Sequence, residues 1–244
     1  MNITHEHEEY MALREKQTPK SKNNGCWYYS NEIVKNIIPR VKTNREWNTV
    51  GRDLTGMHDG MIVILHDNST PWNYEWLKKY KDLVLVCSSD YTARSVAYSG
   101  HVIFVPMSID TSYVRKFKAK KTRETCFVGN WWVRKNLRRS ITGEVDFLSG
   151  LDRQELLEKL ARYKQAYAID RCALEAKCLG CKLLPIQTRY GCTMVNDPEV
   201  LDNRDAAKIL QRELDRIDLA KAIKATGGND GENRIQSDEQ GKGL

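Results

Sequence analysis

The fold is decided by two stretches, Thr125-Cys-Phe-Val-Gly-Asn-Trp-Trp-Val-Arg-Lys-Asn136 and Ala166-Tyr-Ala-Ile-Asp-Arg-Cys-Ala-Leu-Glu-Ala-Lys-Cys-Leu-Gly-Cys-Lys-Leu-Leu-Pro-Ile186. In the first, a short apolar run ends at Gly129, where backbone N–H groups are free to approach a phosphate. In the second, an apolar run leads to Asp170, which can cap a helix, and the helix carries Glu175 and stops at Gly180. Two such strand ends predict a nucleotide crevice at the carboxyl edge of a parallel sheet.

Short apolar runs alternate with helical patterns along most of the chain. The expected strands lie at 61–65, 83–87, 102–105, 126–128, 166–169 and 183–186, and the expected helices at 30–38 and 74–80, after Ser89, from Asp152 through Tyr163 and around Glu175. This alternation favours an α/β fold of two Rossmann-like, doubly wound units that face each other across a cleft.

Composition shifts divide the chain into six predicted parts. They are a mobile N-terminal arm (1–24), a first α/β domain (25–114), a basic linker (115–123), a second, nucleotide-binding α/β domain (124–201), an amphipathic helix (202–225) and a disordered tail (226–244). The helix places Ala206, Ile209, Leu210, Leu214 and Ile217 at helical spacing.

The overall composition is that of a globular protein with a basic surface. Of the 244 residues, 41% are hydrophobic and 29% charged, and the net charge of +7 favours polyanionic partners. No apolar run reaches the ~20 residues of a membrane span, and residues 1–6 do not resemble a signal peptide. The seven cysteines lie mostly in apolar runs, which predicts reduced thiols in a cytoplasmic protein, the host cytoplasm if it is viral. We expect no metal site, and interpret Cys178 and Cys181 as buried thiols rather than zinc ligands.

Four segments in order resemble the group 1 glycosyltransferases, which are retaining enzymes of GT-B architecture that use nucleotide-sugar donors. In that family a strand ends in glycine and a lysine follows six residues later, as Gly129 and Lys135 do here. The family's Glu-Ala-x-x-x-Gly segment is matched from Glu175 to Gly180, and two upstream segments, 83–94 and 102–110, are also similar. The resemblance covers roughly residues 60 to 190.

The resemblance implies roles for individual residues of the second domain. Gly129, Asn130, Arg134 and Lys135 would hold the donor diphosphate, and Glu175 would accept hydrogen bonds from the ribose hydroxyls. The chain departs from the family pattern at Asn130, where the family has arginine, and at Tyr167, where it has a glutamate near the sugar. Asp170 is the nearest carboxylate that could replace that glutamate, although its role as a helix cap would also explain it.

Three further groups have both a functional and a structural interpretation. His66 and Asp67 end an expected strand, where they could act as catalytic residues or as part of a turn. Trp131 and Trp132 could stack on a base or sugar, or pack between domains. The lysines of the basic segment could contact a nucleic-acid acceptor or form a solvated surface; they are Lys118, Lys120 and Lys121.

Two functions are therefore compatible with the sequence. The first is a glycosyltransferase that needs no cofactor and moves a sugar, with retention, from a UDP- or GDP-type donor to an acceptor hydroxyl. The acceptor could be a modified DNA base, as for bacteriophage enzymes that glucosylate DNA, or a small or cell-envelope molecule. The second is a non-catalytic nucleotide or nucleic-acid binding protein on a degenerate glycosyltransferase fold.

Overall fold

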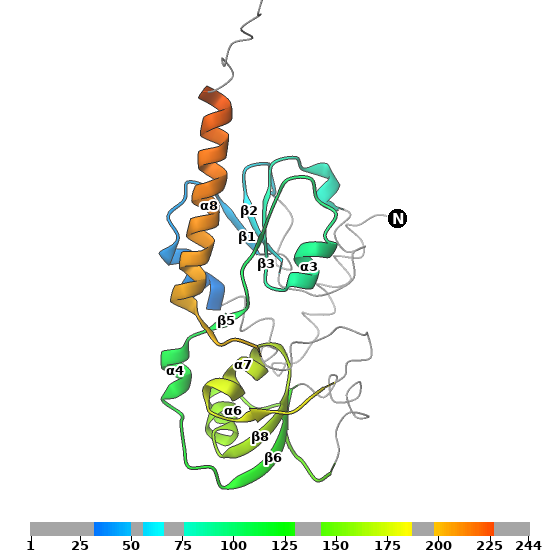
Figure 1. Ribbon diagram of the computed structural model, residues 1–244, viewed down its shortest axis with the longest axis vertical. Coiled ribbons are helices and arrows are strands. Elements are labelled where there is room, and N and C mark those ends of the chain that lie inside the picture. Colours follow the sequence, from blue (N-terminus) through cyan, green and yellow to red (C-terminus); the bar gives the residue numbers. More distant parts are fainter. Residues whose placement is uncertain (1–31, 50–55, 66–75, 130–142, 187–197, 227–244) are drawn as a thin grey trace, which may run out of the picture.

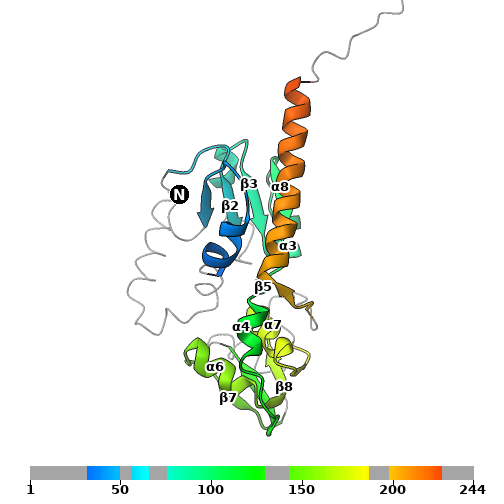
Figure 2. The ribbon, with the colours of Figure 1, turned by 90° about the vertical axis from the view of Figure 1, so that its left-hand side faces the viewer.

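The computed structural model describes residues 32–49, 56–65, 76–129, 143–186 and 198–226. It has two lobes, each built on a four-stranded parallel sheet, and a two-stranded parallel ribbon lies where they meet (Figures 1 and 2). The predicted mixed α/β fold with parallel sheets is confirmed.

The sheet of the N-terminal lobe has the strand order β1-β2-β3-β4, which follows the order of the chain. The strands are β1 (Trp47–Thr49), β2 (Ile62–Leu65), β3 (Val84–Cys87) and β4 (His101–Phe104). Every residue of β2 and β3 is buried, as expected for a parallel sheet that is covered on both faces. Among the described strands of this lobe, the order shows no reversal.

Both faces of this sheet are packed, because alternate residues of each strand point to opposite sides. Ile62 and Ile64 face a core shared with α8 (Asn203–Thr226), whereas Met61 and Val63 belong to a second core on the opposite side. The helical turns η2 (Ile33–Ile37) and η3 (Ile38–Arg40) pack in the same core as α8. Helix α3 (Asp90–Ser95) also belongs to this lobe. Ser89 caps α3 as predicted, since its side chain accepts a hydrogen bond from the Thr92 N–H.

The sheet of the C-terminal lobe has the order β7-β6-β8-β9, and this order does reverse. Its strands are β6 (Arg123–Val128), β7 (Asp146–Leu148), β8 (Tyr163–Ala168) and β9 (Lys182–Leu183). The chain moves from β6 to β7 on one side and then returns to β8 and β9 on the other. Ligands of doubly wound folds bind where the strand order reverses, which here is the carboxyl ends of β6 and β8.

Three helices contribute to the main core of this lobe. They are α4 (Thr111–Arg115), α6 (Arg153–Leu160) and α7 (Asp170–Cys178). Asp152 caps α6 as predicted, accepting a hydrogen bond from the Glu155 N–H at 2.8 Å. The helix ends at Leu160 rather than at Tyr163, because Tyr163 is already the first residue of β8 and is buried there.

The chain crosses between the lobes through β5 (Ser108–Ile109) and β10 (Leu201–Asp202), which pair in parallel. Val105 belongs to the core of the N-terminal lobe, and Ile109 and Val114 belong to that of the C-terminal lobe. The change of core therefore lies between 105 and 109. This corrects the predicted linker at 115–123, whose composition is basic because it is an exposed approach to β6.

Helix α8 returns from the C-terminal lobe and packs along the N-terminal sheet (Figure 2). The predicted helix at 202–225 is confirmed, and its apolar residues face the core as expected: Ala206, Leu210 and Leu214 are buried, with Ile209 and Ile217 packed beside them. Two ion pairs fasten its far half to the lobe, one between Arg45 and Asp218 and one between Lys221 and Asp82.

Asp202 at the crossing provides a prediction about acid stability. Burial raises the pKa of Asp202, but hydrogen bonds from Thr111 and Arg204 outweigh burial and lower the pKa to about 2. Because the folded pKa lies below the unfolded value of about 3.9, this carboxylate stabilises the fold above about pH 4 and loses its contribution as the pH falls toward 2. Asp202→Asn should cost about 2 kcal/mol at neutral pH and remove this part of the acid dependence.

Urea unfolding of wild type and Asp202→Asn at pH 7 and at successively lower pH tests this prediction. The matched control is Asp205→Asn, an exposed carboxylate on the same turn that pairs with Lys208. The difference between wild type and Asp202→Asn should shrink as the medium is acidified, and a difference that stays constant would contradict the expectation.

Candidate functional site at the lobe boundary

The carboxyl ends of β6 and β8 lie next to each other at the edge of the C-terminal sheet that faces the other lobe. Val128 pairs with Ala168 in the last register position, so Gly129 and the Ile169–Asp170 step continue from neighbouring strands. Gly129 has a φ of 155°, a value that residues with a side chain rarely adopt, and Asp170 has a φ of 49°. Among the described residues, Asp170 is the only one other than glycine with a positive φ.

The backbone at Asp170 corrects its predicted role as a helix cap. Ile169 occupies the N-cap position of α7 and provides no side-chain hydrogen bond, while Asp170 is the first helical residue. Its side chain is exposed at the end of the strand. Residues other than glycine in the left-handed region often occur at functional sites, and an acidic residue can adopt this conformation at modest cost.

An arginine lies in the first turn of each of the two helices that begin at this edge, α6 and α7. Arg153 is the first residue of α6 and Arg171 the second of α7, so each lies where the helix dipole is positive. Arg171 donates from Nε and Nη2 to Oε1 of Glu175, at 2.9 and 2.7 Å. Arg153 Nη2 lies 3.4 Å from the same oxygen, and its guanidinium stacks over the Tyr113 ring at 5.1 Å. The edge therefore concentrates positive charge around one buried carboxylate.

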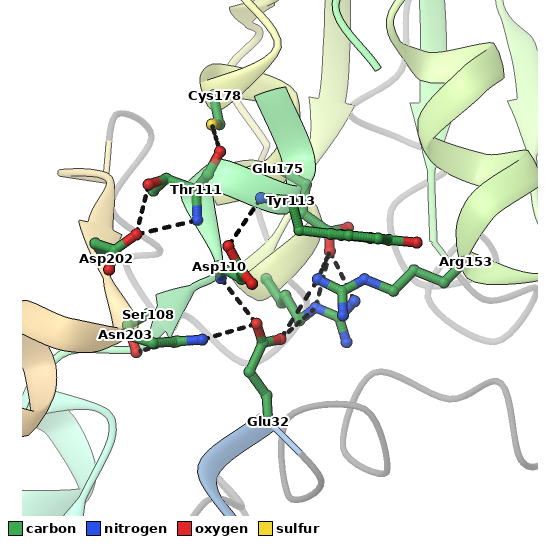
Figure 3. A network of polar contacts seen from close by, with 11 residues as sticks. Glu32, Ser108, Asp110, Thr111, Tyr113, Arg153, Glu175, Cys178, Asp202 and Asn203 are labelled. Carbon is green, nitrogen blue, oxygen red and sulfur yellow. Dashed lines mark hydrogen bonds and ion pairs between the residues drawn. The ribbon is translucent and has the colours of Figure 1, made fainter. Parts of the chain in front are cut away.

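Glu32 brings a second carboxylate to this cluster from the N-terminal lobe (Figure 3). Its Oε1 accepts hydrogen bonds from the Asp110 N–H at 2.8 Å and from Asn203 Nδ2 at 2.9 Å. Its Oε2 faces the arginines at longer range, 3.4 Å from Arg153 Nη2 and 4.0 Å from Arg171 Nε. No hydrogen bond to Oε2 comes from the described residues. Arg171 thus pairs more closely with Glu175 in its own lobe than with Glu32 across the boundary, whereas Arg153 lies 3.4 Å from both carboxylates.

Nearby carboxylates keep the pKa of Arg171 high although its side chain is buried. Burial lowers the pKa of Arg171, but the nearby carboxylates of Glu175 and Glu32 outweigh that effect, so the pKa is raised. The side chains of Glu32, Glu175 and Arg171 are all less than one-tenth exposed, and that of Arg153 is 19% exposed. Two arginines opposite two glutamates leave no net charge among these four groups.

The predicted donor residues have different outcomes. Gly129 and Asp170 lie side by side at the strand ends, as expected. Glu175 lies at the same boundary, but it is buried, with only 1% of its surface exposed. Its Oε1 is already engaged by Arg171, and a ribose could reach this carboxylate only if that contact rearranged. Tyr167 is buried against Phe127 and Ile186, which makes it a core residue of the sheet.

The basic segment lies at the wrong edge to take part in this site. Lys118, Lys120 and Lys121 precede β6, whereas Gly129 follows it. The six residues of β6 span roughly 20 Å, so these lysines lie near the amino edge of the sheet. Lys121 Nζ contacts Cys181 Sγ at 3.4 Å, and Lys118 and Lys120 are exposed. The three lysines therefore lie away from the strand ends that carry Gly129 and Asp170.

The remaining predicted residues lie outside the part of the chain that the structure describes. They are His66, Asp67, Asn130, Trp131, Trp132, Arg134 and Lys135.

The sequence did not identify Glu32, Arg153 and Arg171 as site residues. Arg153 directly follows the capping residue Asp152. Arg171 lies four residues before Glu175, a spacing at which opposite charges on a helix pair. These spacings were visible, but the same pattern occurs on many solvated helices. Glu32 had no local signal, because its partners come from four other segments, at Asp110, Arg153, Arg171 and Asn203.

The cysteine interpretation is confirmed for two residues. Cys178 and Cys181 are buried, and burial raises the pKa of both thiols. Cys181 Sγ lies 3.2 Å from the Tyr163 carbonyl oxygen, to which it can donate. Within the described ranges, no group of three His, Cys, Asp or Glu side chains is arranged to hold a metal ion.

No protein-family model and no curated protein matches this chain. Among the helices of the described residues, none combines the length and apolar character needed to cross a bilayer.

Proposed function

We propose that the protein is a retaining, nucleotide-sugar-dependent glycosyltransferase of GT-B type, with the donor diphosphate bound at the carboxyl ends of β6 and β8. The observation that carries this proposal is the pair of arginines at the starts of α6 and α7, beside the reversal of strand order in the C-terminal sheet. Such a reversal is where nucleotides bind in open α/β sheets, and helix N-termini with arginines suit phosphate oxygens.

The Glu32 carboxylate lies opposite the two arginines, where we place a donor phosphate. Its Oε2 faces Arg153 and Arg171 at 3.4 and 4.0 Å, whereas Glu175 holds Arg171 at 2.7 Å. A phosphate can accept two parallel hydrogen bonds from a guanidinium, which the distant Glu32 oxygen does not do. Donor binding would thus exchange a loose ion pair between the lobes for a closer contact with the diphosphate.

The same arrangement supports sugar transfer without a required cofactor. When the bond between the anomeric carbon and the diphosphate oxygen breaks, negative charge develops on the leaving nucleoside diphosphate. Arg153, Arg171 and the two helix N-termini would stabilise that charge. The acceptor oxygen bonds to the same face of the sugar, and its proton leaves with the diphosphate. Asp170 is an exposed carboxylate at the end of β8, where it would face the incoming sugar.

Calorimetry with a panel of UDP- and GDP-sugars tests the proposal. Wild type should bind at least one donor, and Arg153→Gln should weaken that binding by about tenfold to a hundredfold, the effect of losing a charge-assisted hydrogen bond. Arg162→Gln is the matched control, because it removes an exposed arginine from the opposite edge of the same sheet. A well-folded protein that binds no donor, or two variants that lose affinity equally, would overturn the proposal.

The second candidate is a non-catalytic nucleotide binder on the same fold. The burial of Glu175 in its ion pairs favours it, because a sealed carboxylate makes no contact with a substrate. Release of free nucleoside diphosphate from the bound donor separates the two candidates: a transferase releases it, by transfer or by slow hydrolysis, and a binder does not.

A further inference from the structure

A groove runs between α8 and the η3 turn of the N-terminal lobe. Its volume is about 700 Å³, and it is lined by Arg40, Arg204, Ala207, Lys208, Gln211, Arg212, Asp215, Arg216 and Leu219. Five of the six charged residues in this lining are basic, and four of those five are arginines. The groove therefore differs in charge from the balanced cluster at the lobe boundary.

The basic residues of α8 form a regular row along the groove. Arg204, Lys208, Arg212 and Arg216 follow one another at intervals of four residues, which places them on one face of the helix. At 1.5 Å per residue the row is about 18 Å long. Their side chains are 65 to 78% exposed, so they are accessible to a macromolecule.

Each of these four residues pairs with an acidic neighbour near it in the sequence. Arg204 pairs with Asp202, and Lys208 with Asp205, while Arg212 and Arg216 share Glu213. Exposed pairs of this kind contribute only about 0–1 kcal/mol each, so a stronger anion can replace them. A phosphate backbone brings many charges at once and releases counterions when it binds.

We propose that this groove binds the phosphate backbone of duplex DNA. One strand carries a phosphate about every 3.4 Å along the axis, so a row of about 18 Å spans roughly five base pairs. Arginine suits phosphate because its planar guanidinium can donate two hydrogen bonds at once. A concave basic groove fits a rounded backbone better than a flat bilayer, and apolar exposure on α8 begins only at Leu219, beyond the row.

The groove begins at the lobe boundary. Arg204 directly follows Asn203, whose amide donates to Glu32 in the boundary cluster. Bound DNA would thus extend from the candidate site along the outside of the N-terminal lobe. The proposal does not rest on glycosyl transfer, since the groove and the boundary cluster are formed by different side chains.

The test measures binding to a short labelled DNA duplex by fluorescence anisotropy over a range of salt concentrations. Lys208→Gln/Arg212→Gln/Arg216→Gln should weaken binding about tenfold or more and reduce the slope of log K against log salt by about 2.7, or 0.9 for each lost phosphate contact. Glutamine keeps a helix propensity close to that of lysine and arginine, so α8 should remain folded. If this variant unfolds, Lys208→Gln alone should reduce the slope by about 0.9.

The matched control is Lys116→Gln/Lys118→Gln/Lys120→Gln, which removes the same charge from exposed positions before β6. It should leave the slope nearly unchanged. Equal losses in both triple variants, or no DNA binding by the wild type at low salt, would overturn the proposal, as would binding to anionic phosphatidylserine vesicles without binding to DNA. Donor calorimetry on the groove variant keeps the two proposals separate, because its nucleotide-sugar affinity should equal that of the wild type.

Discussion

Arg171→Met is expected to lower the free energy of unfolding by about 3–5 kcal/mol, because it leaves the buried carboxylate of Glu175 without its nearest cation. Arg171 is 6% exposed and makes two short hydrogen bonds to Glu175, whose own exposure is 1%. Arg153 cannot replace it, since its closest approach to Glu175 is 3.4 Å and it also faces Glu32. Urea unfolding followed by far-ultraviolet circular dichroism measures the change.

A double-mutant cycle identifies the cause of this loss. In Arg171→Met/Glu175→Met both charges disappear and two apolar side chains of similar length remain, so most of the lost stability should return. Arg153 and Glu32 would remain as an oppositely charged pair across the boundary. If the double variant is as unstable as the sum of the single variants, the cost comes from packing rather than from the buried charge.

The elements that sequence patterns predicted correctly depend on local information. Burial on both sides makes β2 and β3 continuous apolar runs, and the caps Ser89 and Asp152 act within their own helical turns. The apolar spacing of α8 likewise records the single face that it packs against the sheet. Short strands such as β1 and β7 were missed, because three residues of mixed polarity carry too little pattern.

The candidate site was harder to predict, because it forms between segments that are distant in the sequence. Gly129 and Asp170 could be placed together, since each ends a recognisable strand. The burial of Glu175 could not be predicted, because it depends on Arg153 from another helix and on Glu32 from the other lobe. The basic segment around Lys118 shows the opposite case. Its charge is visible in the sequence, but the direction of β6 decides at which edge of the sheet it lies.

The second large effect concerns the attachment of α8. Leu210 is 1% exposed and belongs to the core that α8 forms with the sheet and with η2. Leu210→Ala should therefore cost about 3 kcal/mol or more, from lost apolar burial and from the cavity that remains. Leu219→Ala is the matched control on the same helix: Leu219 is 62% exposed, so its truncation should change stability by less than about 0.5 kcal/mol.

Urea unfolding of both variants compares the stabilities, and hydrogen exchange of the α8 amides shows where the loss occurs. If α8 is an integral part of the N-terminal lobe, Leu210→Ala should weaken protection in α8 and in β2 and β3 together, because one core joins them. Loss of protection confined to α8 would mean that the helix detaches separately from the sheet. The ion pairs Arg45–Asp218 and Lys221–Asp82 would then be too weak to hold it, as exposed pairs usually are. In that case the row of basic residues would have no fixed position relative to the lobe boundary, and its regular spacing alone would have to account for any DNA binding.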